Sequence, residues 1–172
     1  LMSDRMNIYV ASSCINLLQP EVVRLLRKCG HEVYNFRHPT PGNRGFVWSD
    51  IDPQWVAWDV TRYRAALQHP IAKARYALDI EALEACDACV LLLPSGHSAS
   101  WKLGYAMGQG KRGAVVQLGA IEPELMYAEA EIITSMDELF DAFAPVDHEL
   151  ALPAGGVVRP ARVPRRPRSV VG

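Results

Sequence analysis

The chain lacks most of the features that mark specialised classes of protein. No apolar run in its 172 residues approaches the roughly 20 residues needed to span a membrane. Its first residues do not have the pattern of a secretory signal peptide. Hydrophobic residues make up 49% and charged residues 22%, which is ordinary for a globular protein. We therefore expect a cytoplasmic protein without membrane association, long enough for one domain with a real core.

Cysteine is scarce, with four residues at Cys14, Cys29, Cys86 and Cys89. The last two form a C-x-x-C pair, but no second pair and no flanking histidine accompanies them. We expect the cysteines to be small buried residues in a reducing compartment. A redox or zinc site at the C-x-x-C pair is the less favoured alternative, and we expect no metal and no cofactor.

Net charge is also small, at −1, but it is unevenly distributed. Residues 153–172 contain five arginines and no acid, so residues 1–152 carry −6. The C-terminal segment is rich in Pro, Gly and Val, which predicts a disordered tail after a single domain over 1–152. Five charges without aromatic residues favour a solvated terminus, and binding of this tail to nucleic acid is the less favoured alternative.

Short apolar runs alternate with segments of helical periodicity along the chain. The pattern predicts strands over 6–11, 32–36, 88–93, 114–118 and 131–134. Helices are predicted from Pro20 to Gly30 and over 52–67, 70–85, 98–109 and 136–143. Strand–helix–strand order favours right-handed parallel crossovers. We therefore predict an α/β fold, a doubly wound, Rossmann- or flavodoxin-like three-layer sandwich with five parallel strands.

One glycine motif is out of place for a dinucleotide site. Residues 108–113 fit G-x-G-x-x-G, but that fingerprint needs a strand before it and a helix after it. Here the predicted helix comes first and the strand follows. We interpret these glycines as the turn that ends a helix.

Two polar turns follow predicted strands. Ser12 and Ser13 come after the first strand, and Gly96, His97 and Ser98 come before a predicted helix. Exposed N–H groups and the helix dipole favour an anion at such a helix start, although Ser98 would equally suit a plain N-cap. Since carboxyl ends of neighbouring parallel strands share one edge, we expect both turns to face one crevice that binds phosphate or sugar.

The segment 37–48 combines proline, glycine, arginine and aromatic residues. Arg37, Phe46 and Trp48 would suit a lid that stacks on a base. An ordinary surface loop with its aromatic residues tucked onto the core is the equal alternative. Asp79 lies on the predicted helix 70–85, where a lone acid is usually a solvated residue.

Several of these segments together resemble the nucleoside 2-deoxyribosyltransferase family and its nucleotide N-glycosidase relatives. The resemblance covers about Met6 to Leu139. It rests on residues 8–13, 34–39, 45–48, the helix with Asp79, 85–90, 98–106, 110–111, 123–127 and 135–139, in that order and spacing. It implies that the chain acts on the N-glycosidic bond of a nucleoside or nucleoside 5′-monophosphate. It also implies a homo-oligomer in which a neighbouring subunit completes the site.

The resemblance further implies a mechanism and roles for individual residues. A glutamate attacks the anomeric carbon and displaces the base, in the manner of retaining glycosidases. Asp79 matches the assisting aspartate, and Ser12, Ser13, Gly96 and Ser98 match the turns that bind sugar or phosphate.

The chain departs from the family at one position, because Lys102 stands where the nucleophilic glutamate is expected. A cation cannot act as a carboxylate nucleophile, and it repels a developing oxocarbenium ion. Four interpretations stay open: an altered enzyme in which another acid such as Asp79 substitutes, a module that binds nucleotides without turnover, a nucleophilic Lys102 that forms a Schiff base, or a Glu→Lys variant of an ordinary enzyme.

Overall fold

A computed structural model describes residues 5–120 and 123–145, with five strands in one sheet. The strands are β1 (Asn7–Ser12), β2 (Glu32–Asn35), β3 (Ala88–Leu92), β4 (Arg112–Val116) and β5 (Glu131–Ile133). They are ordered β2-β1-β3-β4-β5, and every neighbouring pair is parallel. This is the flavodoxin-like doubly wound order, so the predicted fold class is confirmed. The predicted tail over 153–172 and the domain boundary at 152 lie outside the described residues.

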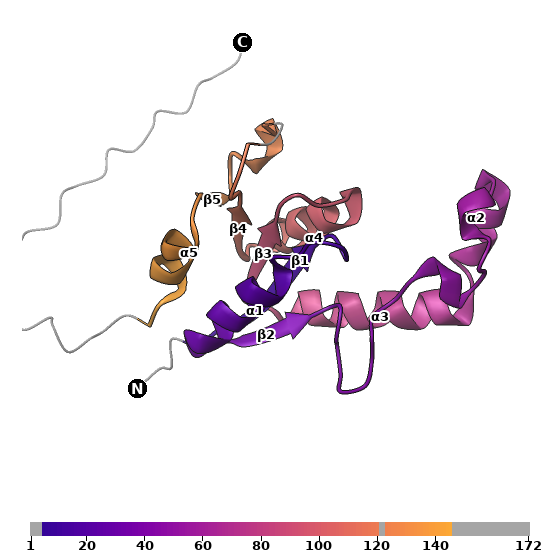
Figure 1. Ribbon diagram of the computed structural model, residues 1–172, viewed down its shortest axis with the longest axis horizontal. Coiled ribbons are helices and arrows are strands. Elements are labelled where there is room, and N and C mark those ends of the chain that lie inside the picture. Colours follow the sequence, from indigo (N-terminus) through magenta and orange to yellow (C-terminus); the bar gives the residue numbers. More distant parts are fainter. Residues whose placement is uncertain (1–4, 121–122, 146–172) are drawn as a thin grey trace, which may run out of the picture.

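Helices cover both faces of the sheet (Figure 1). Side chains of α1 (Gln19–Lys28) and α5 (Met136–Phe143) share one core cluster with the strands. The other cluster joins the strands to α3 (Pro70–Ala85) and α4 (His97–Gly108). The three layers follow from strand alternation, because successive side chains of a strand face opposite sides.

Alternation in β1 decides which residue reaches the site. Ile8 and Val10 pack toward α1 and α5, whereas Tyr9 and Ala11 belong to the cluster under α3 and α4. Tyr9 is paired in register with Tyr34 of β2, and their rings stack with centroids 5.0 Å apart. The hydroxyl groups of two tyrosines are thereby brought to the same face of the sheet.

Residues 48–69, here named the arm, differ from the prediction. Instead of one helix over 52–67 they form two 3-10 turns, η1 (Trp48–Asp50) and η2 (Trp55–Ala57), followed by α2 (Val60–Ala66). The helix prediction is wrong because two aspartates stop the chain from continuing as one helix. Asp59 has an extended backbone and accepts a hydrogen bond from the backbone N–H of Arg62, so that a new helix begins there.

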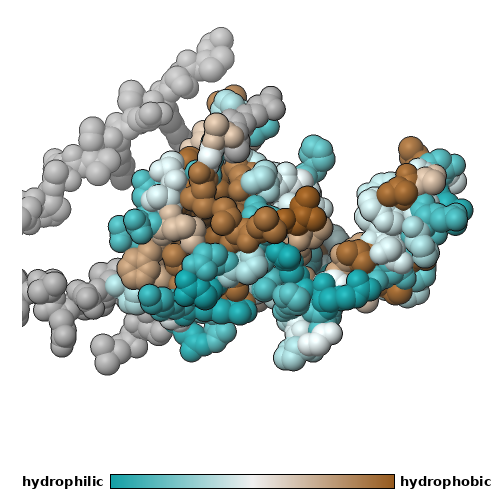
Figure 2. All heavy atoms as spheres, in the orientation of Figure 1, coloured by the Kyte–Doolittle hydropathy of each residue, from teal (hydrophilic) through white to brown (hydrophobic). Residues whose placement is uncertain are grey.

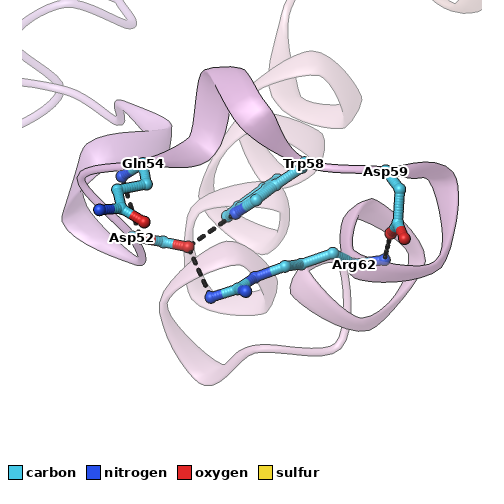
Figure 3. Close-up of polar contacts among 5 residues, drawn as sticks. All are labelled: Asp52, Gln54, Trp58, Asp59 and Arg62. Atoms are coloured by element: carbon cyan, nitrogen blue, oxygen red, sulfur yellow. Dashed lines mark hydrogen bonds and ion pairs between the residues drawn. The ribbon is translucent and has the colours of Figure 1, made fainter.

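Asp52 is the other aspartate, and it holds the arm together (Figure 3). Its carboxylate accepts hydrogen bonds from the backbone N–H of Gln54 at 2.9 Å, from the indole N–H of Trp58 at 2.8 Å and from the Arg62 guanidinium at 2.9 Å. The bond from Trp58, followed by the other donors, holds the pKa of Asp52 below its usual value. Figure 1 shows α2 at the N-terminal end of α3, away from the sheet.

The remaining elements lie close to their predicted positions, with α3 and α5 matching within the expected range of boundary error. The strand β4 begins two residues before the predicted 114–118 and ends at Val116. In the described part of the chain, no helix has the length and apolar character required to cross a membrane.

Candidate functional site

A cavity of about 520 Å³ opens between α3, α4, the segment after β2 and the arm. Aromatic side chains form much of its wall, namely Phe36, Phe46, Trp48 and Tyr76. Its polar lining includes Asp79 and Lys102, which are half-buried, and Ser98, which is exposed. A largely apolar cavity with a few convergent polar groups is typical of a small-molecule site, and its volume is in the range of such sites.

Four side chains from four elements, here named the floor, meet where Asp79 and Lys102 line the cavity, with Tyr9 and Tyr34 behind them and outside the lining. The Lys102 ammonium on α4 lies 2.5 Å from one carboxylate oxygen of Asp79 on α3 and donates a second hydrogen bond to the Tyr9 hydroxyl at 2.9 Å. The Tyr34 hydroxyl donates to the other carboxylate oxygen of Asp79 at 3.2 Å. The floor is therefore an ion pair held between two tyrosines.

The electrostatics of the floor keep both tyrosines protonated. Burial, followed by the charge of the Asp79 carboxylate, raises the pKa of Tyr9 far above its usual range. The same two causes raise the pKa of Tyr34. Neither hydroxyl can therefore serve as a general base near neutral pH.

The Lys102 nitrogen lies 5.2 Å from the ring centroids of both Tyr9 and Phe36, within the range of cation–π attraction. Its side chain is 16% exposed, so solvent screening of its contacts is limited. An ammonium has three N–H donors, and the described residues accept two of them. One donor is left for a group in the cavity.

A glycine fixes the loop that carries the aromatic wall. Gly45 has a φ of +82°, and a Cβ at this position would come within 3.0 Å of the Phe36 carbonyl oxygen. Both the positive φ and the close approach require glycine. Because residue 45 is glycine, the loop can lie against the end of β2, and this brings Phe46 to the cavity. Trp48 packs edge-on against Phe46, with ring centroids 4.9 Å apart, and against Trp58, with centroids 5.5 Å apart. Phe46 and Trp48 line the cavity, and the lid that stacks on a base stays a prediction.

The expected single crevice at the carboxyl edge of the sheet is divided in the structure. Ser98 lines the cavity just described, whereas Ser13 and Gly96 line a separate cavity of about 500 Å³. Ser12 is buried and donates its hydroxyl to the Ser13 carbonyl. Asn16 donates to the Pro94 carbonyl at 3.2 Å and ties the two turns together, so Ser13 and Gly96 share one cavity while Ser98 lines the other.

Two other predicted binding residues also lie apart from the cavity lining. Arg37 donates to the Asn16 carbonyl at 3.1 Å and contacts the Gln19 side chain at 3.5 Å, so it braces the end of β2 against the start of α1. His97 is exposed as the first residue of α4. The structure therefore brings together Trp48, Asp79, Ser98 and Lys102 among the predicted residues.

Sequence reasoning missed several residues of the cavity. Behind the cavity lining, Tyr9 was interpreted as a strand residue alone, although its hydroxyl accepts a hydrogen bond from Lys102. On α3, Ala72, Arg75, Tyr76 and Asp79 all line the cavity. Their spacing of i, i+3, i+4 and i+7 is that of one helical face, and this signal is present in the sequence.

The cysteines take no part in this chemistry. Cys29, Cys86 and Cys89 are buried, but Cys14 is exposed, which corrects the expectation for that residue. Burial raises the pKa of the Cys89 thiol to about 12 and also raises that of Cys86, which makes both poor nucleophiles. Within residues 5–120 and 123–145, no three His, Cys, Asp or Glu side chains form a group that could hold a metal ion.

Comparisons with known proteins find matches among solved structures. No protein-family model matches the sequence, and no curated protein matches it. A solved structure of a 2-deoxyribosyltransferase from the psychrotolerant bacterium Bacillus psychrosaccharolyticus is similar, with a TM-score of 0.49 and 16% identity over 80% of this chain and 96% of that one. The fold class of this chain rests on its own strand order and register.

Proposed function

We propose that the protein binds a nucleoside or a nucleoside 5′-monophosphate in the cavity between α3, α4 and the arm, and that it holds this ligand without cleaving the N-glycosidic bond. The absence of cleavage is argued from the ion pair between Lys102 and Asp79, in which the nitrogen and a carboxylate oxygen are 2.5 Å apart. The ligand class follows from the shape of the cavity and from the sequence resemblance.

The walls of the cavity suit a flat heteroaromatic ring. Phe36, Phe46, Trp48 and Tyr76 offer aromatic surfaces around about 520 Å³. Aromatic side chains stack on bases with little regard for base identity, because every base has a π-face. The base of the ligand is therefore assigned to this part of the cavity.

The floor suits a sugar with several hydroxyl groups. Asp79 can accept hydrogen bonds, Ser98 can donate and accept, and Lys102 has one donor left within the described part of the chain. The sugar would then lie between α3 and α4, with its anomeric carbon near the ion pair.

Turnover is disfavoured by the same ion pair. Among the described residues that line the cavity, Asp79 is the one carboxylate, and Lys102 neutralises it. Departure of the base builds positive charge on the sugar, which an adjacent ammonium destabilises. As the ammonium of this ion pair, the Lys102 nitrogen has no lone pair with which to attack a sugar carbon.

A second candidate function is slow cleavage or transfer of the N-glycosidic bond by an altered enzyme. It is favoured by the position of Asp79, which lines the cavity and is oriented by the Tyr34 hydroxyl at 3.2 Å. In that case Asp79 would act on the sugar or the leaving base in place of the missing glutamate.

The test combines binding with product detection. The purified full chain is incubated with pyrimidine and purine nucleosides and their 5′-monophosphates, and binding is followed by calorimetry while free base is followed by chromatography. The Lys102→Glu variant is measured alongside, with Lys28→Glu as a matched charge change on the exposed end of α1. We expect binding without base release by the wild type and by Lys28→Glu, and base release by Lys102→Glu.

Other outcomes discriminate between the candidates. Release of base by the wild type would establish the second candidate and remove the first. Absence of binding to every compound would overturn both. Binding by all variants with no release from Lys102→Glu would keep the binding function and show that more than the nucleophile separates this chain from an enzyme.

A homo-oligomer remains part of the proposal. The arm exposes apolar side chains, including Val56 at 78% and Val60 at 74%, and Figure 2 shows hydrophobic residues at the top of the lobe that the arm forms on the right. Such surface is covered in many proteins by a second copy of the chain. Light scattering coupled to size-exclusion chromatography measures the mass directly, and a monomer at all concentrations would contradict this part.

A further inference from the structure

The charges around the cavity are unbalanced. Four charged side chains line it, of which Lys73, Arg75 and Lys102 are cations and Asp79 is an anion, so the net charge of the lining is +2. The surrounding chain is acidic, with −6 over residues 1–152. A cationic hollow on an acidic protein concentrates anionic ligands, because low-dielectric walls focus the field into it.

Lys102 is not the source of this excess, since Asp79 compensates its charge. The unpaired cations are Lys73 and Arg75. Within the described part of the chain, the side chain of neither residue makes a hydrogen bond or an ion pair, whereas Arg44 and Arg62 pair with acids of the arm. Arg75 is also half-buried.

Arg75 lies close to the floor on the same helical face. It precedes Asp79 by four residues, which places it one turn away, about 6 Å along the axis of α3. Its positive charge opposes the rise in the pKa of Tyr34 that burial and Asp79 cause, so its field reaches the floor. It also lines the neighbouring cavity beside Asn43 and Arg44, so it stands where the site opens outward.

We propose that Arg75, assisted by Lys73, binds the phosphate of a nucleoside 5′-monophosphate, and that the cavity thereby selects the nucleotide over the nucleoside. This inference rests on the proposed function and adds the group that recognises the charged end of the ligand. A guanidinium fork matches phosphate oxygens in a bidentate manner. The phosphate is thus assigned to α3 and the mouth of the cavity, and not to the turn with Gly96, His97 and Ser98 that the sequence favoured.

The experiment measures the ratio of two affinities. Calorimetric titrations compare each 2′-deoxynucleoside with its 5′-monophosphate for the wild type and for Arg75→Gln, Arg75→Lys, Lys73→Gln and Ser98→Ala. Arg64→Gln on α2 is the matched control, because Arg64 is exposed and lies outside the cavity lining. We expect the wild type to prefer the monophosphate about tenfold to one hundredfold, as a charge-assisted contact provides.

Arg75→Gln should remove most of this preference while affinity for the nucleoside stays near that of the wild type. Lys73→Gln should lower the preference less, and Arg75→Lys should retain part of it because the charge stays and the fork is lost. Ser98→Ala and Arg64→Gln should leave the ratio unchanged. The preference of the wild type for the monophosphate over the nucleoside should also fall as the salt concentration is raised.

Three results would overturn the inference. Equal affinity of the wild type for nucleoside and monophosphate would do so and leave the proposed function standing. An unchanged ratio in Arg75→Gln, with loss of the ratio in Ser98→Ala, would place the phosphate at the start of α4. Failure of all compounds to bind would overturn the proposed function and this inference together. Circular dichroism of each variant verifies folding, and Arg75→Lys replaces Arg75→Gln if the latter does not fold.

Discussion

The sheet and the arm position aromatic side chains of the candidate site by different means, with Tyr9 behind Lys102 and Trp48 in the cavity wall. Tyr9 is 0% exposed and belongs to a strand that is hydrogen-bonded to neighbours on both sides. Trp48 belongs to the arm, in which Ala66 is the one buried residue of the described chain between 48 and 69. The floor is therefore fixed by backbone pairing and the wall by contacts between side chains.

This difference predicts which substitutions change stability and which change the shape of the cavity. A buried strand residue is surrounded by close-packed neighbours, and these neighbours cannot move to accommodate a side chain of a different size. The arm depends on a few polar contacts centred on Asp52 and on edge-on ring contacts at Trp48. Substitutions in the sheet should change the free energy of unfolding, whereas substitutions in the arm should mainly change the shape of the cavity wall.

The largest effect should come from shortening a core side chain. Leu91 on β3 is completely buried between the sheet and α4. Leu91→Ala should lower the free energy of unfolding by about 2–5 kcal/mol, through lost burial and the cavity left behind. Urea titration followed by circular dichroism measures it. A change as small as that of an exposed residue would contradict the rigid-floor description.

The next effect concerns alkaline pH. The pKa of Tyr9 is raised in the folded protein, so its stabilising contribution is complete below the usual tyrosine pKa of about 10 and is lost as the pH rises above it. The free energy of unfolding should fall by up to about 1.4 kcal/mol per pH unit from this one group above pH 10.

Tyr9→Phe should remove that part of the slope, and Tyr63→Phe on the exposed arm is the matched control. Denaturant titrations at several pH values between 9 and 11.5 supply the comparison. Equal slopes for the wild type and Tyr9→Phe would show that the Tyr9 hydroxyl is not enclosed as described.

Acid should weaken the arm before it weakens the sheet. The pKa of Asp52 is lowered, mainly by the bond from Trp58, so its contribution is present above the usual aspartate pKa and is lost as the pH falls below it. Asp52→Asn cannot titrate and should flatten the acid part of a tryptophan fluorescence profile, with little change in circular dichroism. Superimposable acid profiles of wild type and Asp52→Asn would mean that this carboxylate does not hold Trp58.

The smallest effect should be seen at Val56 in the arm, which is 78% exposed. Val56→Ala should change the free energy of unfolding by less than about 0.5 kcal/mol. It is the exposed counterpart of Leu91→Ala and is measured in the same urea titrations. A large loss of stability, or a change of mass by light scattering, would show that a second copy of the chain covers the arm.

The sequence was a good guide to the elements of the sheet and a poor guide to the arm. Apolar runs and helical periodicity are local signals, and they located the five strands and α3. The same periodicity wrongly joined residues 52–67 into one helix. The aspartates at 52 and 59 satisfy backbone and side-chain donors of the arm, and this local competition was not recognised from the spacing of Ile51, Trp55 and Trp58.

The same division holds for the candidate site. By itself the sequence determined the α/β order and the polar turns that follow the strands, while Lys102 in place of a carboxylate stays a prediction from the resemblance. Tertiary structure alone decided that Lys102 meets Asp79, 23 residues earlier, and Tyr9, 93 residues earlier. It also decided that Arg75 faces the cavity without a protein partner in the described chain. Periodicity reports which face of its own element a residue occupies, whereas a contact between elements depends on register, helix placement and packing, and these are set by the whole chain at once.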